Sequence, residues 1–143
     1  QPGALLEFQN SFFNGDTDSI KKDNPEIALQ RDGTIDPSKY WFNVDGFERS
    51  AASQPASFQK RSFPFRIDNV RGPGYFLVNA NVVRNFSIGG NRSLQFRLDV
   101  QNLLDSVLWS NPDMNPTSTN FGKVTGATNS IMRFFTFVWK VNF

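Results

Sequence analysis

Residues 130–143 at the end of the chain alternate between two rows of side chains. One row, read in steps of two, is almost entirely aromatic or branched aliphatic, and the row between is mixed. Because successive side chains of a β-strand point to opposite faces of a sheet, this period of two predicts a strand with one strongly apolar face. The apolar row includes Phe135, Phe137, Trp139, Val141 and Phe143.

Residues 92–104 show the same period, with a sharper division between apolar and polar positions. A helix would spread Arg97 and Asp99 around the same circumference as the apolar side chains, so the pattern favours a strand. The apolar row includes Leu94, Phe96, Leu98 and Val100, and the polar row includes Gln95, Arg97, Asp99 and Gln101.

A third segment of period two covers residues 75–88, with Arg84 as the charged exception in its apolar row. Gly89, Gly90 and Asn91 follow directly, and residues of these types accept the positive φ of a tight hairpin turn. We therefore expect segments 75–88 and 92–104 to be antiparallel neighbours. The apolar row includes Phe76, Val78, Val82 and Phe86, and the opposite row includes Asn79, Asn81 and Asn85.

A weaker alternation predicts a fourth strand over residues 4–13. Residues 14–74 and 105–129 are long and polar, are rich in turn-forming residues, and have no sustained period. We expect both of these stretches to be loops without regular secondary structure.

The connections between the expected strands alternate between short and long. A transmembrane β-barrel has this arrangement, with short turns on the periplasmic side and long loops outside, and its strands need about 9–11 residues to cross the hydrocarbon. No run approaches the roughly 18 apolar residues of a membrane-spanning helix. The predicted fold is therefore all-β, with about four antiparallel strands forming the last part of a transmembrane β-barrel and two long outer loops.

Composition narrows the range of functions. The chain of 143 residues has 15 Lys and Arg against 13 Asp and Glu, and it has neither His nor Cys. The small net charge argues against a nucleic-acid-binding surface. Without His and Cys, the Ser/His/Asp and Cys/His catalytic sets, the usual zinc sites and disulfides are excluded. We expect no enzymatic activity and no cofactor.

Several motifs and their order resemble the TonB-dependent receptors. The segment LQFRLDVQNLLD, residues 94–105, looks like the penultimate-strand motif of these receptors. The succession WFNVDGFER, QPASFQKRSFPFR, NVRGPGYF, VVRNFSI and NPTSTNFGKVTG is similar to the end of the large members that carry an N-terminal carboxypeptidase-regulatory-like domain. The resemblance covers nearly the whole chain.

The resemblance implies a location in the outer membrane of a diderm bacterium and energised import of a scarce solute. It also implies several partners: the remaining strands of a barrel of about 22 strands, a plug domain, outer-membrane lipid, and the TonB complex through regions absent here. Four strands cannot close a barrel, so we expect the chain to be a fragment or one component of an assembly. The closing aromatic strand resembles the assembly signal of outer-membrane barrels, with residues Phe135, Phe137, Trp139, Val141 and Phe143.

The barrel interpretation assigns each row of side chains to one environment. One face would contact lipid and the other would line the lumen. The lipid-facing residues would be Leu94, Phe96, Leu98, Val100, Phe76, Val78, Val82 and Phe86. The lumen-facing residues would be Arg97, Asp99, Gln101, Lys140, Asn79 and Asn81.

Aromatic residues gather within the first long loop. Tyr40, Trp41, Phe42 and Phe47 could form an outer platform on which a sugar stacks, or they could pack the loop onto its own barrel. A second functional class also stays open, namely a soluble or surface β-sheet module that binds carbohydrate or a protein partner. The sequence singles out no solute among iron chelates, cobalamin, oligosaccharides and peptides.

Overall fold

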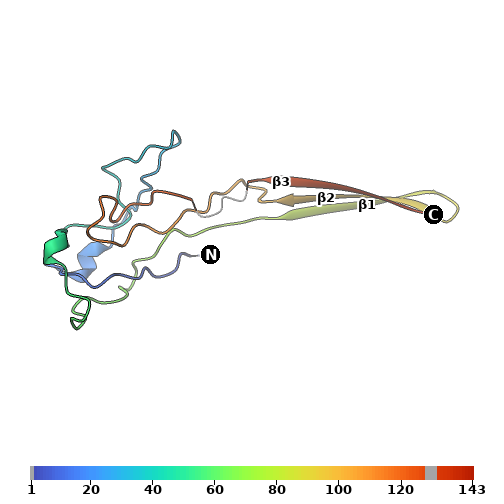
Figure 1. The fold of residues 1–143 in the computed structure, drawn as a ribbon. Helices are drawn as coiled ribbons and strands as arrows, with labels where there is room; N and C mark the ends of the chain where they lie inside the picture. The colour runs from blue at the N-terminus through green and yellow to red at the C-terminus, as the bar shows by residue number, and fades with distance from the viewer. Residues whose placement is uncertain (1, 128–131) are drawn as a thin grey trace. The chain divides into compact units, whose positions relative to one another are not determined.

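The computed structural model describes residues 2–127 and 132–143, which divide into two compact units (Figure 1). The sheet unit comprises residues 75–108 and 132–143. The loop unit comprises residues 2–74 and 109–127.

The sheet unit contains three antiparallel strands in the order β1-β2-β3, formed by described residues (Figure 1). They are β1 (Ala80–Gly89), β2 (Arg92–Gln101) and β3 (Phe134–Asn142). Val82 lies opposite Leu98, and Leu98 lies opposite Phe137. Since directly opposite residues of neighbouring strands point to the same side of a sheet, the apolar rows of the three strands combine into one face. The antiparallel all-β fold is as the sequence predicts.

The β1–β2 hairpin turns where the sequence predicts. Gly89 and Gly90 have φ angles of 104° and 62°, values that an L-residue with a Cβ rarely adopts. The register shifts between Ser87 and Gly89, so the turn absorbs one irregular position. The Gly-Gly-Asn sequence is therefore used for its backbone freedom.

The strands are shorter than the periodic segments at their ends away from this hairpin. β2 ends at Gln101 rather than at residue 104, because Asn102 and Asp105 have φ angles of 49° and 54°. β1 begins at Ala80 rather than at residue 75. The residues that precede β1 remain hydrogen-bonded to those that follow β2, since the Leu103 N–H donates to the Val78 carbonyl at 2.8 Å. Residues 130 and 131 of the segment expected to form the last strand lie outside the described residues.

The expected strand over residues 4–13 is wrong. This segment makes isolated bridges at Leu5 and Phe13 instead of a continuous ladder. Its backbone bonds go to several segments, for example from Leu6 N–H to the Val70 carbonyl and from Asn14 N–H to the Gly46 carbonyl. The alternation had another cause, because Leu6 and Phe8 point into the core of the loop unit, where each is 2% exposed.

The loop unit is irregular in its backbone and has a hydrophobic core. Among its described residues, the helical elements are the short 3₁₀ turns η1 (Thr17–Ile20) and η2 (Ala51–Ser53). No described helix is long and apolar enough to cross a membrane, a result that concerns helices alone. The core gathers side chains from the 4–13 segment and from both long stretches, namely Leu6, Phe8, Ile20, Phe42, Phe47, Phe63, Ile67, Val70 and Phe121.

Candidate functional site

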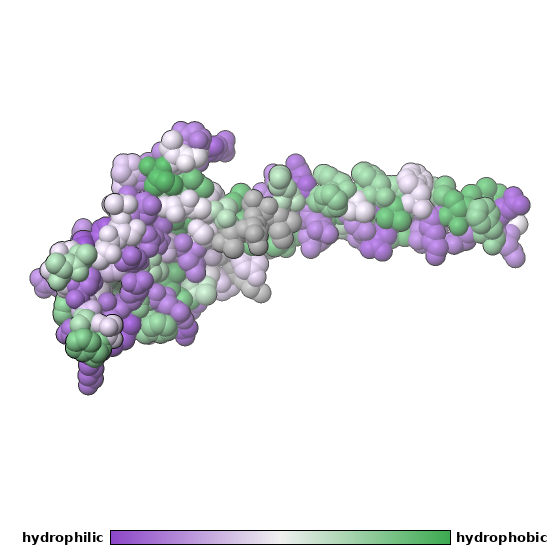
Figure 2. Space-filling model, viewed as in Figure 1, coloured by the Kyte–Doolittle hydropathy of each residue, from purple (hydrophilic) through white to green (hydrophobic). Residues whose placement is uncertain are grey.

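The apolar face of the sheet unit is widely exposed. Phe137, Trp139 and Val82 are 61%, 63% and 57% exposed, and hydrophobic residues follow the length of the sheet in Figure 2. A soluble protein rarely leaves so continuous an apolar patch uncovered. By the strand register, this face carries the expected lipid-facing residues of β1 and β2 together with the aromatic row of β3, namely Val82, Phe86, Leu94, Phe96, Leu98, Val100, Phe135, Phe137, Trp139 and Val141.

Two expected lipid-facing residues, Phe76 and Val78, precede β1 and lie outside the regular ladder. Arg84 is on the apolar face opposite Phe96, with its guanidinium 5.8 Å from the centre of the Phe86 ring. Phe96 also contacts the Trp139 ring at a centroid distance of 4.7 Å. Phe143 follows the end of β3, and the assembly-signal role expected for this row stays a prediction.

The opposite face of the sheet carries a polar network. Arg97 Nε donates to both carboxylate oxygens of Asp99, at 2.8 and 2.9 Å. Asn81 donates its amide to the same carboxylate at 3.1 Å. These residues border a depression of about 540 Å³ together with the expected lumen residues Asn79 and Gln101. Lys140 lies opposite Gln95 on this face, farther along the strands. The structure thus brings the expected lumen-facing residues to one side of the sheet.

The four aromatic residues of the first loop do not form an exposed stacking platform. Phe42 and Phe47 are only 1% and 7% exposed. Their rings pack edge-on against Phe121 at 5.4 and 5.1 Å, so burial in the core takes the faces that a ligand would need. Tyr40 and Trp41 are half-buried and remain available to line depressions.

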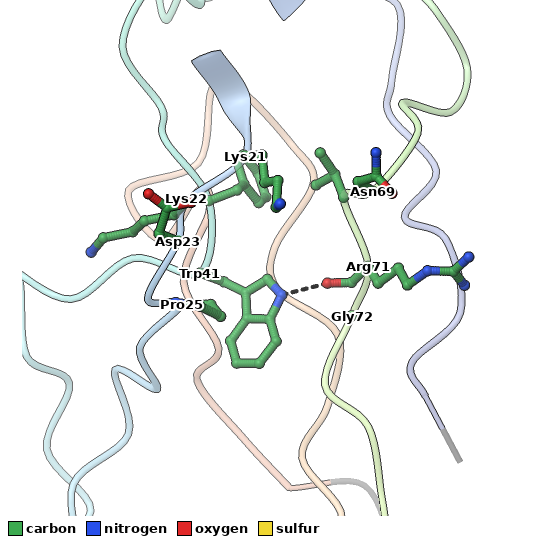
Figure 3. Close-up of a pocket in the computed structure, with 10 residues that line it drawn as sticks. Lys21, Lys22, Asp23, Pro25, Trp41, Asn69, Arg71 and Gly72 are labelled. Carbon is green, nitrogen blue, oxygen red and sulfur yellow. Dashed lines mark hydrogen bonds between the residues drawn. The ribbon is translucent and has the colours of Figure 1, made fainter. Parts of the chain in front are cut away.

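Trp41 borders a hollow of about 290 Å³ in the loop unit (Figure 3). The indole Nε1–H donates to the Arg71 carbonyl at 2.6 Å, which fixes the ring against the chain at residues 71–72. Pro25, Phe42 and Val70 supply the other apolar walls. The hollow is therefore shaped by an indole whose position is held by a hydrogen bond.

The charged residues around this hollow differ in how they are paired. Lys22 is bound to Glu26 at 2.8 Å, and Arg71 directs its guanidinium to the Gly3 carbonyl, away from Trp41 (Figure 3). Within the described part of the chain, the side chains of Lys21, Asp23 and Asn69 form no hydrogen bond or ion pair. No pattern in the sequence pointed to these three residues.

A positive φ marks one wall of the hollow. Asn69 has a φ of 69° in the turn that Val70 N–H closes onto the Ile67 carbonyl. Asn tolerates this left-handed conformation better than most residues. The Asp68-Asn69 pair was the signal for a turn here, although nothing in the sequence indicated that Trp41 would lie beside it.

Two carboxylates of the loop unit stabilise tight turns. The Thr34 hydroxyl and backbone N–H lower the pKa of Asp32, and the Ser38 hydroxyl and backbone N–H lower the pKa of Asp36. Both arrangements are turns closed by an aspartate side chain. In the described ranges no group of three or more His, Cys, Asp or Glu residues could hold a metal ion.

Residues 1–135 match a protein-family model described as outer membrane beta barrel domain. No curated protein and no solved structure matches the chain.

Proposed function

Because the chain belongs to the outer membrane β-barrel domain family and so lies in the outer membrane of a diderm bacterium, we propose that it is part of a TonB-dependent receptor. The receptor imports a scarce solute with energy passed through the TonB complex. The chain supplies wall strands and two long loops, and it has a transport role rather than an enzymatic one.

The two-faced sheet is the observation that supports this proposal best. Its apolar face, with Phe137 and Trp139 more than half exposed, suits contact with lipid. Its other face, with the Arg97–Asp99 pair and the neighbouring amides, suits a wet lumen or a polar plug domain. In this scheme the edges of β1 and β3 pair with the remaining strands of the receptor, since open edges are not tolerated in lipid.

The connections between the strands support the same topology. The short turn at Gly89 and Gly90 joins one pair of strand ends, and the long stretches of the chain leave from the opposite ends. In the proposed receptor the short turn is periplasmic and the long stretches are extracellular. Residues of the loop unit are then available to solutes outside the cell.

The test is a binding experiment on the receptor taken from detergent-solubilised outer membranes. We expect a species much larger than 16 kDa that migrates differently with and without heating, and that is retained by the immobilised periplasmic domain of TonB from the same bacterium. A heat-modifiable barrel that TonB fails to retain, with and without a culture extract as a source of solute, would contradict the TonB-dependent role.

A further inference from the structure

We propose that the hollow beside Trp41 binds an uncharged saccharide ring. The inference deepens the proposed function by naming a solute class, and it rests on the loop unit being exposed to the outside of the cell, as that function requires. It concerns one site, whose walls come from residues 21–23, 25, 41–42 and 69–72.

The indole of Trp41 gives the hollow an apolar wall. Trp41 packs against the core cluster and also borders the hollow. The core side chains therefore support the indole on the side away from the hollow. The Trp41–Arg71 hydrogen bond keeps the ring in place before any ligand arrives. A sugar ring has one side made of C–H groups, and a fixed aromatic ring is a suitable surface for it because little side-chain freedom is lost on binding.

Three polar side chains without partners among the described residues also line the hollow. Lys21 offers donors only, the Asp23 carboxylate offers acceptors only, and the Asn69 amide offers both. None of these three side chains is paired among the described residues. In Figure 3 the Lys21 ammonium end lies on the side of the indole nitrogen. Sugar hydroxyls both donate and accept, so they can match all three groups at once.

The charges around the hollow favour a neutral ligand. One unpaired ammonium and one unpaired carboxylate leave the hollow with no net preference for an ion, because Lys22 is neutralised by Glu26 and the Arg71 guanidinium is turned away. The Asp23 carboxylate would repel a strongly anionic chelate, and the Lys21 ammonium would repel a cation. Neither group repels a neutral solute with many hydroxyls.

The volume of the hollow limits the size of the ligand. Small-molecule pockets range from about 300 to 1,000 Å³, and this hollow of about 290 Å³ is at the lower limit. It suits a single ring or the terminal ring of a longer chain, and it is too small to enclose an iron chelate or a cobalamin.

The test is saturation-transfer NMR on the detergent-purified receptor. The probes are glucose, galactose, mannose, xylose and N-acetylglucosamine, with galacturonic acid, glucosamine and inorganic phosphate as charged comparisons. We expect saturable binding of at least one neutral sugar. Lys21→Gln and Asp23→Asn should each weaken it about tenfold, and Trp41→Ala should abolish it. Lys60→Gln, which removes an exposed lysine that lines none of the hollows described above, should leave binding unchanged.

The inference would be overturned by the absence of binding of any neutral sugar, or by binding that none of the three pocket variants weakens. A preference for galacturonic acid, glucosamine or phosphate would also overturn it. Lys21 and Asp23 have no partners within the described residues, so their variants should retain the heat-modifiable barrel, and loss of binding then reports the site. TonB retention is measured separately, so failure of the sugar site is distinguishable from failure of the proposed function.

Discussion

The two units of the chain use phenylalanine in opposite ways. In the loop unit, Phe8, Phe42 and Phe121 are 2%, 1% and 1% exposed, although the backbone around them is irregular. In the sheet unit the backbone is regular, yet Phe135 and Phe137 are 49% and 61% exposed. Regular secondary structure and burial are therefore independent here. The loop unit covers its own apolar surface, whereas the sheet needs its surroundings to cover the apolar face.

The difference extends to hydrogen bonding. The sheet satisfies its backbone through two continuous ladders. The loop unit uses scattered long-range bonds, such as those from Trp41 N–H to the Gly122 carbonyl and from Leu29 N–H to the Val124 carbonyl. Arg49 adds bonds to the carbonyls of Pro116 and Ser118, which tie the two long stretches together.

The largest expected effect comes from removing one aromatic ring from the core of the loop unit. Phe47 contacts the rings of Phe8, Phe13, Phe63 and Phe121 at centroid distances from 4.8 to 6.1 Å. Phe47→Ala should destabilise the loop unit by about 3–5 kcal/mol, because it leaves a cavity among packed rings. Hydrogen exchange of the Asn14 and Trp41 amides in the purified receptor measures the loss. Phe137→Ala is the control, and an equal increase in exchange at these amides would contradict the contrast.

A charge on the apolar face of the sheet should destabilise the folded protein nearly as much. Leu98 lies between Val82 and Phe137 on that face. For a residue near the middle of the bilayer, Leu98→Arg should destabilise the barrel folded in lipid by about 2–4 kcal/mol. Gln95→Arg places the same charge on the other face and should be tolerated. The yield of heat-modifiable barrel in lipid vesicles compares the two, and equal yields would remove the lipid-facing assignment.

A smaller effect is expected where a glycine permits close packing in the loop unit. Gly122 has a φ of 76°, and an added Cβ would lie 2.5 Å from Val44 Cγ1. Gly33 has a φ of 84° with nothing within 4 Å. Both changes to Ala incur about 1–2 kcal/mol of backbone strain, and Gly122→Ala adds the steric clash. Limited proteolysis should therefore show faster cleavage in Gly122→Ala than in Gly33→Ala, and the reverse order would be inconsistent with this packing.

The smallest effect is expected at acidic pH, where a turn of the loop unit should lose stability. The pKa of Asp36 in the folded protein is below its ordinary value of 3.8. The turn stabilisation is therefore complete above pH 3.8 and is lost as the pH falls through the lower folded value. Protection of the Ser38 amide, corrected for intrinsic exchange, should decrease over that range and stay constant in Asp36→Asn. The same decrease in the variant would show that another group is responsible.

The sequence predicted the sheet well and the loop unit poorly, for one physical reason. A period of two is a local signal, so the faces of Leu94 to Val100 and of Phe135 to Val141 could be read without knowing their partners. The core of the loop unit depends on contacts between distant residues, such as Phe42 and Phe121. The alternation of Leu6 and Phe8 reflected burial in that core, and it resembled a strand in the sequence.

The residues of the candidate site also divide into those that the sequence singled out and those that only the folded structure brings together. Tyr40 and Trp41 were identified as aromatic residues in a polar stretch, which is visible locally. Their separation from Phe42 and Phe47 by burial was not visible, because it depends on which rings the rest of the chain brings to them. Lys21, Asp23 and Asn69 could not be associated with Trp41 from the sequence, since only the folded loop unit places them around one hollow.

The Gly89-Gly90 turn has a consequence for the order of folding. It joins strands that pair residue by residue from Ser87 and Ser93 outward, so β1 and β2 can zip together with little loss of chain entropy. Hairpins of this kind form in about 1–10 μs. The bond between Trp41 and Gly122 closes a far longer loop, which slows folding. During biogenesis the hairpin should therefore be an early intermediate, and the loop unit should mature last.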